Sequence, residues 1–163
     1  MTSMQTSEVS FEDFFGMAEP LLRHALVAAV GRERGRDATA EALAYGWEHW
    51  SDLRSMTNPV GYLYRVGRSR VRTRRHRIEF NPVAMHVVAD AGSSRIPEFE
   101  PGLPDALAHL SERQRIAVFL VHGMDWTRRD VADLLGISVN SVGSHLGRGL
   151  AKLRKRLGVS IDE

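Results

Sequence analysis

The sequence contains no cysteine, which excludes disulfide bonds, thiolate metal sites and a cysteine nucleophile. No apolar run approaches the roughly 18 residues that a membrane-spanning helix needs. The first residues are polar and acidic rather than basic and then apolar, so they do not resemble a signal sequence. We therefore expect neither secretion nor membrane insertion, and a cytoplasmic location fits this composition.

Motifs for catalysis and cofactor binding are also missing. There is no phosphate-binding glycine loop, no nucleophile elbow and no carboxylate cluster that would suit two metal ions. The seven histidines do not pair with one another or with carboxylates at a spacing typical of metal ligands. We predict no catalytic residue, no metal site and no cofactor, and we expect that the protein is not an enzyme.

The remaining composition is that of an ordinary globular protein. Of the 163 residues, 43% are hydrophobic and 26% are charged, which excludes a disordered chain. This length suits one domain or two small ones. The formal net charge is only +2, although the pI is near 9.4, so the positions of the charges are more informative than their sum.

The N-terminal part of the chain has the period of an amphipathic helix. Ser10, followed by Asp13, is typical of a helix start. The apolar residues that then recur at helical spacing are Phe14, Met17, Leu21, Leu22, Ala25, Leu26 and Ala29. Pro20 lies inside this pattern, so we expect it to kink or split the helix.

Two more helices are predicted before residue 78. The arginine-rich segment 32–36 is expected to form a charged loop, and a second helix then runs from about 37 to 53. The large apolar positions of this helix are Leu43, Trp47 and Trp50. Asn58 followed by Pro59 is a strong helix start, and this third helix is expected to end near Arg77.

Residues 78–102 interrupt the helical pattern. This segment contains three prolines, two glycines and a serine pair without a sustained period, which is typical of a linker. Beyond it, a helix is expected near Pro104, and Ser111 with Gln114 forms a capping box for another. The fold class predicted is therefore all-α: two small helical domains, 1–77 and 103–163, joined by the linker 78–102.

A helix-turn-helix is predicted within the segment 127–157. Thr127 with Asp130 would cap its first helix, Gly136 would end that helix, and Ser138 would cap the second. The polar side of the second helix carries Asn140, Ser141, Ser144, His145, Arg148 and Lys152. Such a helix reads base edges in the major groove of DNA. The alternative is a structural hairpin with a solvated basic face.

A run of arginines in the third predicted helix indicates a second site for nucleic acid. Seven arginines fall within thirteen residues without an acidic residue: Arg65, Arg68, Arg70, Arg72, Arg74, Arg75 and Arg77. Such a helix repels itself unless a polyanion neutralises it. Tyr62 and Tyr64 precede the run, and an aromatic ring beside cations suits an unstacked base. The alternative is a solvated basic face with both tyrosines in the core.

The order of these elements resembles the bacterial extracytoplasmic-function (ECF) sigma factors, which contain sigma regions two and four. The segments 37–50 and 58–77 resemble region two, and the segment 103–157 resembles region four. The resemblance implies RNA polymerase core and promoter DNA as partners, with promoter recognition and DNA opening as the function. It favours Tyr62 over Tyr64 as the exposed tyrosine.

The resemblance also implies roles for particular residues. The polymerase-binding residues implied are Asp37, Glu41 and Trp47. Those implied at the minus-ten element are Tyr62, Arg65, Arg68, Ser69, Arg72 and Arg75. Those implied at the minus-thirty-five element are Arg128, Asn140, Ser141, Ser144, His145, Arg148 and Lys152. Because no further domain follows Glu163, control is expected to come from an anti-sigma factor, another regulatory protein or the expression level.

Five positions depart from the usual pattern of the family: Ala40 replaces a glutamine, Ser69 an asparagine, Thr73 an aspartate, Gly143 a lysine and His145 an arginine. Gly143, Gly147 and Gly149 also lower the helix propensity of the reading helix. We expect weaker minus-thirty-five binding than is typical, or a helix that DNA or a partner stabilises. The alternatives are a stand-alone helix-turn-helix regulator and a degenerate sigma-like interaction module.

Overall fold

Serine and threonine caps begin several helices of the computed structural model, which describes residues 9–71 and 101–159. In each cap the side-chain oxygen accepts a hydrogen bond from the backbone N–H three residues later, and the capping residues are Ser10, Ser111, Thr127 and Ser138. Asn58 does the same for the N–H of Gly61, at 2.8 Å. The predicted helix starts are confirmed because each depends only on residues within one turn.

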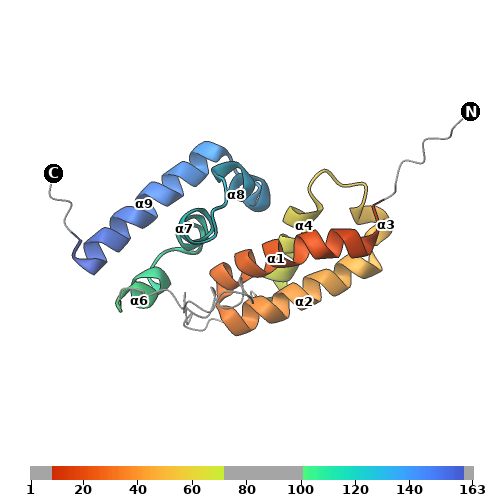
Figure 1. Ribbon diagram of the computed structural model, residues 1–163, viewed down its shortest axis with the longest axis horizontal. Helices are drawn as coiled ribbons and strands as arrows, with labels where there is room; N and C mark the ends of the chain where they lie inside the picture. Colours follow the sequence, from red (N-terminus) through yellow and green to blue (C-terminus); the bar gives the residue numbers. More distant parts are fainter. Residues whose placement is uncertain (1–8, 72–100, 160–163) are drawn as a thin grey trace, which may run out of the picture.

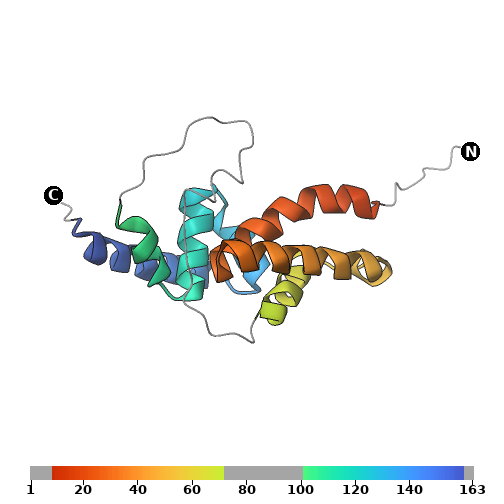
Figure 2. The same cartoon turned by 90° about the horizontal axis from the view of Figure 1, so that it is seen from below.

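The N-terminal helices are α1 (Phe11–Val30), α2 (Arg32–Glu48), α3 (Trp50–Leu53) and α4 (Pro59–Val71). Figure 1 shows α1 and α2 side by side, with α4 crossing them. Pro20 does not split α1, which continues to Val30 and bends along its length in Figure 2. The part of the third predicted helix beyond Val71 lies outside the described residues.

The predicted loop at residues 32–36 is wrong, because this segment is the first part of α2. The break comes at Gly31, whose φ of 90° lies in the region that glycine tolerates. Gly35 is instead buried, and a Cβ on it would lie 2.5 Å from the Cα of Val27. Gly35 therefore allows α1 and α2 to approach closely rather than forming a turn.

The second predicted helix has different boundaries and a different buried face. It ends as α2 at Glu48, His49 interrupts it, and Trp50 begins the short α3. Leu43 is buried and Trp50 is half-buried, as the apolar pattern predicts. Met17 and Trp47 are 52% and 61% exposed, however, although both were assigned to apolar faces. Alanines and glycines fill much of the α1–α2 contact, which leaves these two large side chains outside it.

The C-terminal helices are α6 (Leu103–Ala108), α7 (Glu112–Val118), the π-helix η1 (Phe119–Gly123), α8 (Arg128–Leu135) and α9 (Val139–Leu157). No strand occurs within residues 9–71 and 101–159, so the all-α prediction is confirmed there. The linker 78–102 falls almost entirely on residues outside these ranges. Among the helices described, none is long and apolar enough to cross a membrane.

The two helical groups pack against each other. Helix α1 contacts α7 and η1, and α4 contacts α8. Figure 2 shows the C-terminal helices against one end of the α1–α2 pair. At this boundary the guanidinium of Arg115 is 1% exposed and donates to the carbonyl oxygens of Ala28 and Ala29, at 2.7 and 2.8 Å. A side chain of the C-terminal group thus binds carbonyls in the last turn of α1.

Candidate nucleic-acid interface

Helices α8 and α9 form the predicted helix-turn-helix. The Thr127 hydroxyl accepts from the N–H of Asp130 at 3.1 Å, and the Asp130 carboxylate accepts from the N–H of Thr127 at 3.0 Å. Gly136 ends α8 in the left-handed conformation, with φ 65°. The Ser138 hydroxyl then accepts from the N–H of Ser141 at 3.1 Å and begins α9. Local hydrogen bonds therefore fix the turn between the two helices.

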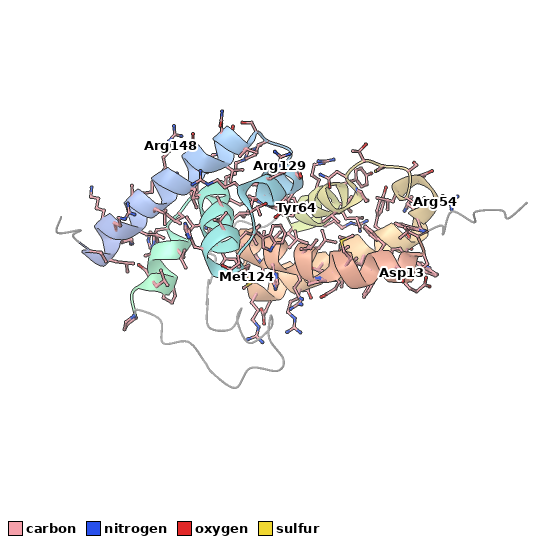
Figure 3. All side chains as sticks on the ribbon, turned by 45° about the horizontal axis from the view of Figure 1, so that its top comes forward. Asp13, Arg54, Tyr64, Met124, Arg129 and Arg148 are labelled. Carbon is pink, nitrogen blue, oxygen red and sulfur yellow. The ribbon has the colours of Figure 1, made fainter. Side chains whose placement is uncertain are left out.

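One face of α9 is packed and the other is open. The buried residues of α9 face α7 and α8, and they are Val142, Leu146, Gly149 and Leu153. The predicted DNA-reading residues lie on the remaining surface: Asn140, Ser144, Arg148 and Lys152 are exposed, and Ser141 and His145 are half-buried. Figure 3 shows Arg148 pointing away from the bundle. The fold therefore brings this group of residues together on one accessible surface.

Arg128 extends this surface from the first turn of α8. It is exposed, and its Nη1 would lie 3.7 Å from a Cβ built on Gly143. The guanidinium of Arg128 thus lies over the position in α9 where the family usually has a lysine. A cation is present at this point of the surface even though residue 143 has no side chain.

His145 lies among cations on the same surface. Burial, with a smaller contribution from Arg113 and Arg148, lowers the pKa of His145 below its ordinary value. His145 is therefore neutral near pH 7 and offers a hydrogen-bonding ring rather than a positive charge. Arg148 and Lys152 provide the cations of the exposed face of α9.

The two tyrosines of α4 have different environments. Tyr64 is 5% exposed, and burial raises the pKa of its hydroxyl. Tyr62 is half-buried, and the guanidinium carbon of Arg65 lies 5.8 Å from the centre of its ring. The prediction that Tyr62 is the more exposed tyrosine is confirmed. The Tyr62 hydroxyl also lies 3.2 Å from that of Tyr45, and this hydrogen bond is the main cause of a raised pKa at Tyr45.

The arginines of α4 differ in what they contact. Arg65 is exposed, whereas Arg68 forms a two-pronged ion pair with Glu112 of α7, with 2.6 Å between Nε and Oε1. Arg70 lies 3.5 Å from Glu41 of α2, an exposed pair of little energetic weight. Ser69 is exposed and its hydroxyl donates to the carbonyl of Val66. Arg72 and Arg75, also predicted at this site, lie outside the described residues.

An open groove of about 820 Å³ runs between α1 and α2. Its lining combines aromatic, aliphatic and basic side chains, among them Phe11, Phe15, Arg23, Arg36, Leu43 and Trp47. Of the three residues predicted to bind polymerase, Trp47 lines this groove, while Asp37 and Glu41 are exposed on α2 outside it. Ala40, where the family usually has a glutamine, also lines the groove.

Sequence reasoning missed the contribution of α1 to this groove. Phe11 and Phe15 are at positions i and i+4, which places them on one face of α1. Their ring centres are 6.1 Å apart. Phe14 lies in the core on a different face. This i, i+4 pair of aromatics beside the core face was the available signal. Glu112 and Arg115 were also missed, because their partners are far away in the sequence.

Comparison with known proteins agrees with the helix-turn-helix assignment. Residues 102–153 match the protein family described as Sigma-70, region 4. The fold resembles that of the sigma factor RpoE from Bartonella quintana, whose crystal structure is of a complex with the anti-sigma factor NepR. The two chains are 19% identical, the TM-score is 0.58, and the match covers 94% of this chain and 98% of the other. No curated protein matches the chain.

The family match and the shared fold cover different parts of the chain. The family match covers α6, α7, α8 and most of α9. The structural likeness extends over both helical groups. Residues 102–153 are therefore similar to sigma-70 region 4, and both helical groups share the fold of a sigma factor of known structure.

Proposed function

We propose that the protein is a sigma factor that binds RNA polymerase core, directs it to promoters and assists DNA opening. The observation that carries this proposal is the open polar face of α9 within a region 4 domain. In the same chain, α4 presents an aromatic ring beside a cation. The proposed boundaries are 1–77 for the domain that contacts polymerase and the minus-ten element, 78–102 for the linker and 103–163 for the minus-thirty-five domain.

The minus-thirty-five element is read by α9. A helix of its 19 residues is about 28 Å long, and the major groove, about 12 Å wide, admits such a helix. Arg128, Arg148 and Lys152 supply charge for phosphates, while Asn140 and Ser144 offer short polar groups for base edges. His145 stays neutral and adds a donor and an acceptor. The phosphate contacts position α9, and the short polar side chains provide sequence preference.

The minus-ten element is captured by α4. Opening DNA costs a few kcal/mol of stacking and pairing, which a stacked base and paired phosphates recover. Tyr62 provides an accessible ring, and Arg65 and Arg68 provide cations on the same helix. Arg72 and Arg75 continue this basic track in the sequence. No covalent step belongs to this mechanism, so we propose a non-enzymatic role.

RNA polymerase core binds along α2 and its groove with α1. Trp47 is a large, exposed aromatic side chain of the kind that is enriched at the energetic centre of protein interfaces. Asp37 and Glu41 supply charge next to the groove. Polymerase and DNA as partners imply a cytoplasmic location. By analogy with the Bartonella quintana sigma factor, an anti-sigma factor or a similar regulatory protein is the proposed inhibitor.

In vitro transcription tests this proposal directly. The full chain is mixed with sigma-free core polymerase and a promoter library, and the transcripts are sequenced. A sigma factor yields specific start sites that disappear without the chain. Duplex DNA binding without any effect on core polymerase would identify a stand-alone regulator, and core binding without transcripts a degenerate module. Either result would overturn the proposal.

A matched pair of variants tests whether transcription depends on the open face of α9. Arg148→Ala removes a charge from the open face and should reduce initiation or change the selected start sites. Arg156→Ala removes the same charge near the end of α9, where Arg156 pairs with Asp105 of α6 at 3.3 Å. Equal effects of the two variants would argue against the assigned reading face.

A further inference from the structure

Arg128 carries a positive charge at a place where it does not stabilise the fold. It is the first residue of α8, directly after the cap Thr127. The N-terminal end of a helix carries partial positive charge, so a cation is disfavoured there, whereas the acid Asp130 in the same turn is favoured. The Arg128 side chain is exposed, and it makes no hydrogen bond or ion pair within residues 9–71 and 101–159. The needs of the local structure therefore do not explain this arginine.

The guanidinium of Arg128 lies over Gly143 of α9. A Cβ built on Gly143 would lie 3.7 Å from Nη1 of Arg128, an ordinary van der Waals distance, and no atom of Arg129 lies within 4 Å of it. A side chain at position 143 would have to begin at this Cβ. Gly143 thus leaves a gap in the surface of α9, and a cation that belongs to α8 lies beside the gap.

The gap belongs to the exposed face of α9. Asn140 and Ser144 are exposed, and a Cβ on Gly147 would have nothing within 4 Å. Positions 140, 143, 144 and 147 lie on one side of the helix, because they are three or four residues apart. All four residues are small or short, so no bulky α9 side chain stands between this face and a DNA groove. Arg128 therefore lies next to the face of α9 that would meet base edges.

The chemistry of a guanidinium suits a guanine at this position. In the major groove a guanine presents two acceptors, N7 and O6, and an arginine binds both of them with two N–H donors. A cation at the start of the first helix of a helix-turn-helix ordinarily meets phosphates, because that helix crosses the DNA backbone. Arg128 begins this helix but reaches α9, and no carboxylate in the described part of the chain occupies its donors.

We infer that Arg128 reads a guanine in the major groove beside the gap at Gly143, in place of the α9 side chain that this position lacks. This contact adds base selection to the phosphate charge already proposed for Arg128. Gly143 is then a specificity-determining position, because a side chain longer than that of alanine would compete with the guanidinium for the same space. The inference rests on the proposed function, since α9 must enter the major groove of DNA.

Arg128→Ala and Arg129→Ala form a matched pair of variants. Both remove one exposed positive charge from the first turn of α8, and only Arg128→Ala removes the group beside Gly143. Neither change should lower the free energy of unfolding, because removing a cation from a helix N-terminus is neutral or favourable. Urea denaturation therefore separates a DNA contact from a structural role. A destabilised Arg128→Ala would overturn the premise that the fold does not need this residue.

Substitutions at position 143 test whether Arg128 replaces a missing side chain. Gly143→Lys returns a cation to α9, so it should restore part of the affinity that Arg128→Ala loses. In the parent the same lysine would lie beside Arg128 as a like charge, so its gain there should be smaller. Gly143→Ala is the control, because it adds a Cβ and helix propensity without a charge, and it should restore nothing. Equal effects of Gly143→Lys in both backgrounds would overturn the inference.

Base preference is measured on the full chain without polymerase. A duplex library randomised over about 20 base pairs, roughly two turns of DNA, is selected for binding and sequenced. Fluorescence anisotropy then measures the affinity for the preferred duplex and for duplexes in which each G·C pair in turn becomes A·T. Arg128→Ala should weaken binding of the preferred duplex about five- to 150-fold, the discrimination of one bidentate arginine–guanine contact, and abolish the preference at one base pair. Arg129→Ala should keep that preference.

Each other outcome identifies what is wrong. A loss of affinity in Arg128→Ala with every base preference kept would show a phosphate contact only and overturn the inference. If Arg148→Ala changes binding and Arg128→Ala does not, α9 remains the reading helix and the role given to Arg128 is wrong. A library in which no sequence is enriched would overturn both the inference and the reading role of α9. Failed transcription together with a guanine preference that depends on Arg128 would overturn only the sigma-factor proposal.

Discussion

A Cβ atom on Gly149 would lie 2.8 Å from Cγ2 of Val118, so any larger residue at position 149 would force α9 or Val118 of α7 to shift. By contrast, a Cβ on Gly143 would meet only an arginine tip at 3.7 Å, and one on Gly147 would meet nothing within 4 Å. The three glycines of α9 were all expected to weaken the helix. In the structure, Gly149 has a packing role, whereas Gly143 and Gly147 occupy open positions.

These glycines give a prediction with an internal control. Gly147→Ala should raise the free energy of unfolding by up to about 1 kcal/mol, because alanine is the better helix former at an exposed position. Gly149→Ala should lower it by about 1–3 kcal/mol, because the methyl group overpacks the contact with Val118. Urea denaturation followed by circular dichroism measures both. A stabilising Gly149→Ala would contradict the tight contact.

Arg115 is predicted to contribute more to the free energy of unfolding than any exposed arginine does. Replacing it by methionine keeps much of the volume but leaves the carbonyls of Ala28, Ala29 and Leu110 without its donors. We expect a loss of about 2–4 kcal/mol in the free energy of unfolding, since hydrogen bonds to charged groups contribute about 1.5–3 kcal/mol and buried groups left unpaired add to the cost. Thermal and urea denaturation measure it.

The control for this change is Arg113→Met, two residues away on the same helix. Arg113 is exposed, so its replacement should alter the free energy of unfolding by no more than about 0.5 kcal/mol. Similar losses for the two variants would show that the cross-domain hydrogen bonds of Arg115 contribute little.

The sequence predicted the elements that local chemistry determines. The capping boxes at Ser111 and Thr127 and the left-handed Gly136 require only residues within a turn, and all were located correctly. The alternation of exposed and buried positions on α9 follows from the same 3.6-residue period. This is why the sequence alone could place most of the predicted minus-thirty-five residues on the accessible face of α9.

The failures concern contacts between distant segments. Gly35 has the composition of a loop, and only the approach of Val27 explains why it lies in a helix. Arg115 is 86 and 87 residues away from its partners in α1, and Arg68 is 44 away from Glu112. A single sequence contains no local signal for such pairs. The packing of α4 against the second domain was therefore not foreseen.

Trp47 is predicted to contribute to polymerase binding more than to stability. Its side chain is 61% exposed, and its main contact is an edge-on approach to Phe11 with 5.2 Å between ring centres. Trp47→Ala should cost no more than about 1.5 kcal/mol in the free energy of unfolding, the range of one aromatic pair. It should weaken binding to core polymerase at least tenfold, as expected for a central interface aromatic. Surface-immobilised core measures the affinity.

Trp50→Ala is the matched control on the neighbouring helix. Trp50 is half-buried, with its ring centre 4.9 Å from that of the core residue Phe14, so this change should reduce stability more than Trp47→Ala does. At a temperature where both variants are folded, only Trp47→Ala should lose polymerase affinity. Unchanged affinity in Trp47→Ala would exclude the groove as the polymerase site.

Tyr62 is predicted to hold a base of the opened strand. Tyr62→Ala should weaken binding of a single-stranded oligonucleotide by about 1–3 kcal/mol, the range for one base stacked on an aromatic ring. Tyr62→Phe keeps the ring and loses only the hydroxyl contact with Tyr45, so it should bind nearly as well as the parent. Fluorescence anisotropy measures the affinities. Equal losses in both variants would assign the effect to the hydroxyl rather than to stacking.

His145 gives a prediction on pH dependence. Burial, together with Arg113 and Arg148, lowers its pKa in the folded protein, whereas the unfolded chain has the ordinary value near 6.5. Around that pH the unfolded state therefore binds more protons, so the free energy of unfolding rises with pH through this range. The contribution of His145 is complete above the unfolded value and is lost as the pH falls through the lower folded value.

Replacing His145 by glutamine removes this linkage while keeping a polar side chain. The difference in the free energy of unfolding between pH 5 and pH 7.5 should therefore be smaller in His145→Gln than in the parent. Urea denaturation at both pH values measures this difference. Asn140→Gln serves as the control, because it changes an exposed side chain of α9 without removing a titratable group, and it should keep the parent slope. If the slope of His145→Gln equals that of the parent, burial and the neighbouring cations do not lower the pKa of His145 as proposed.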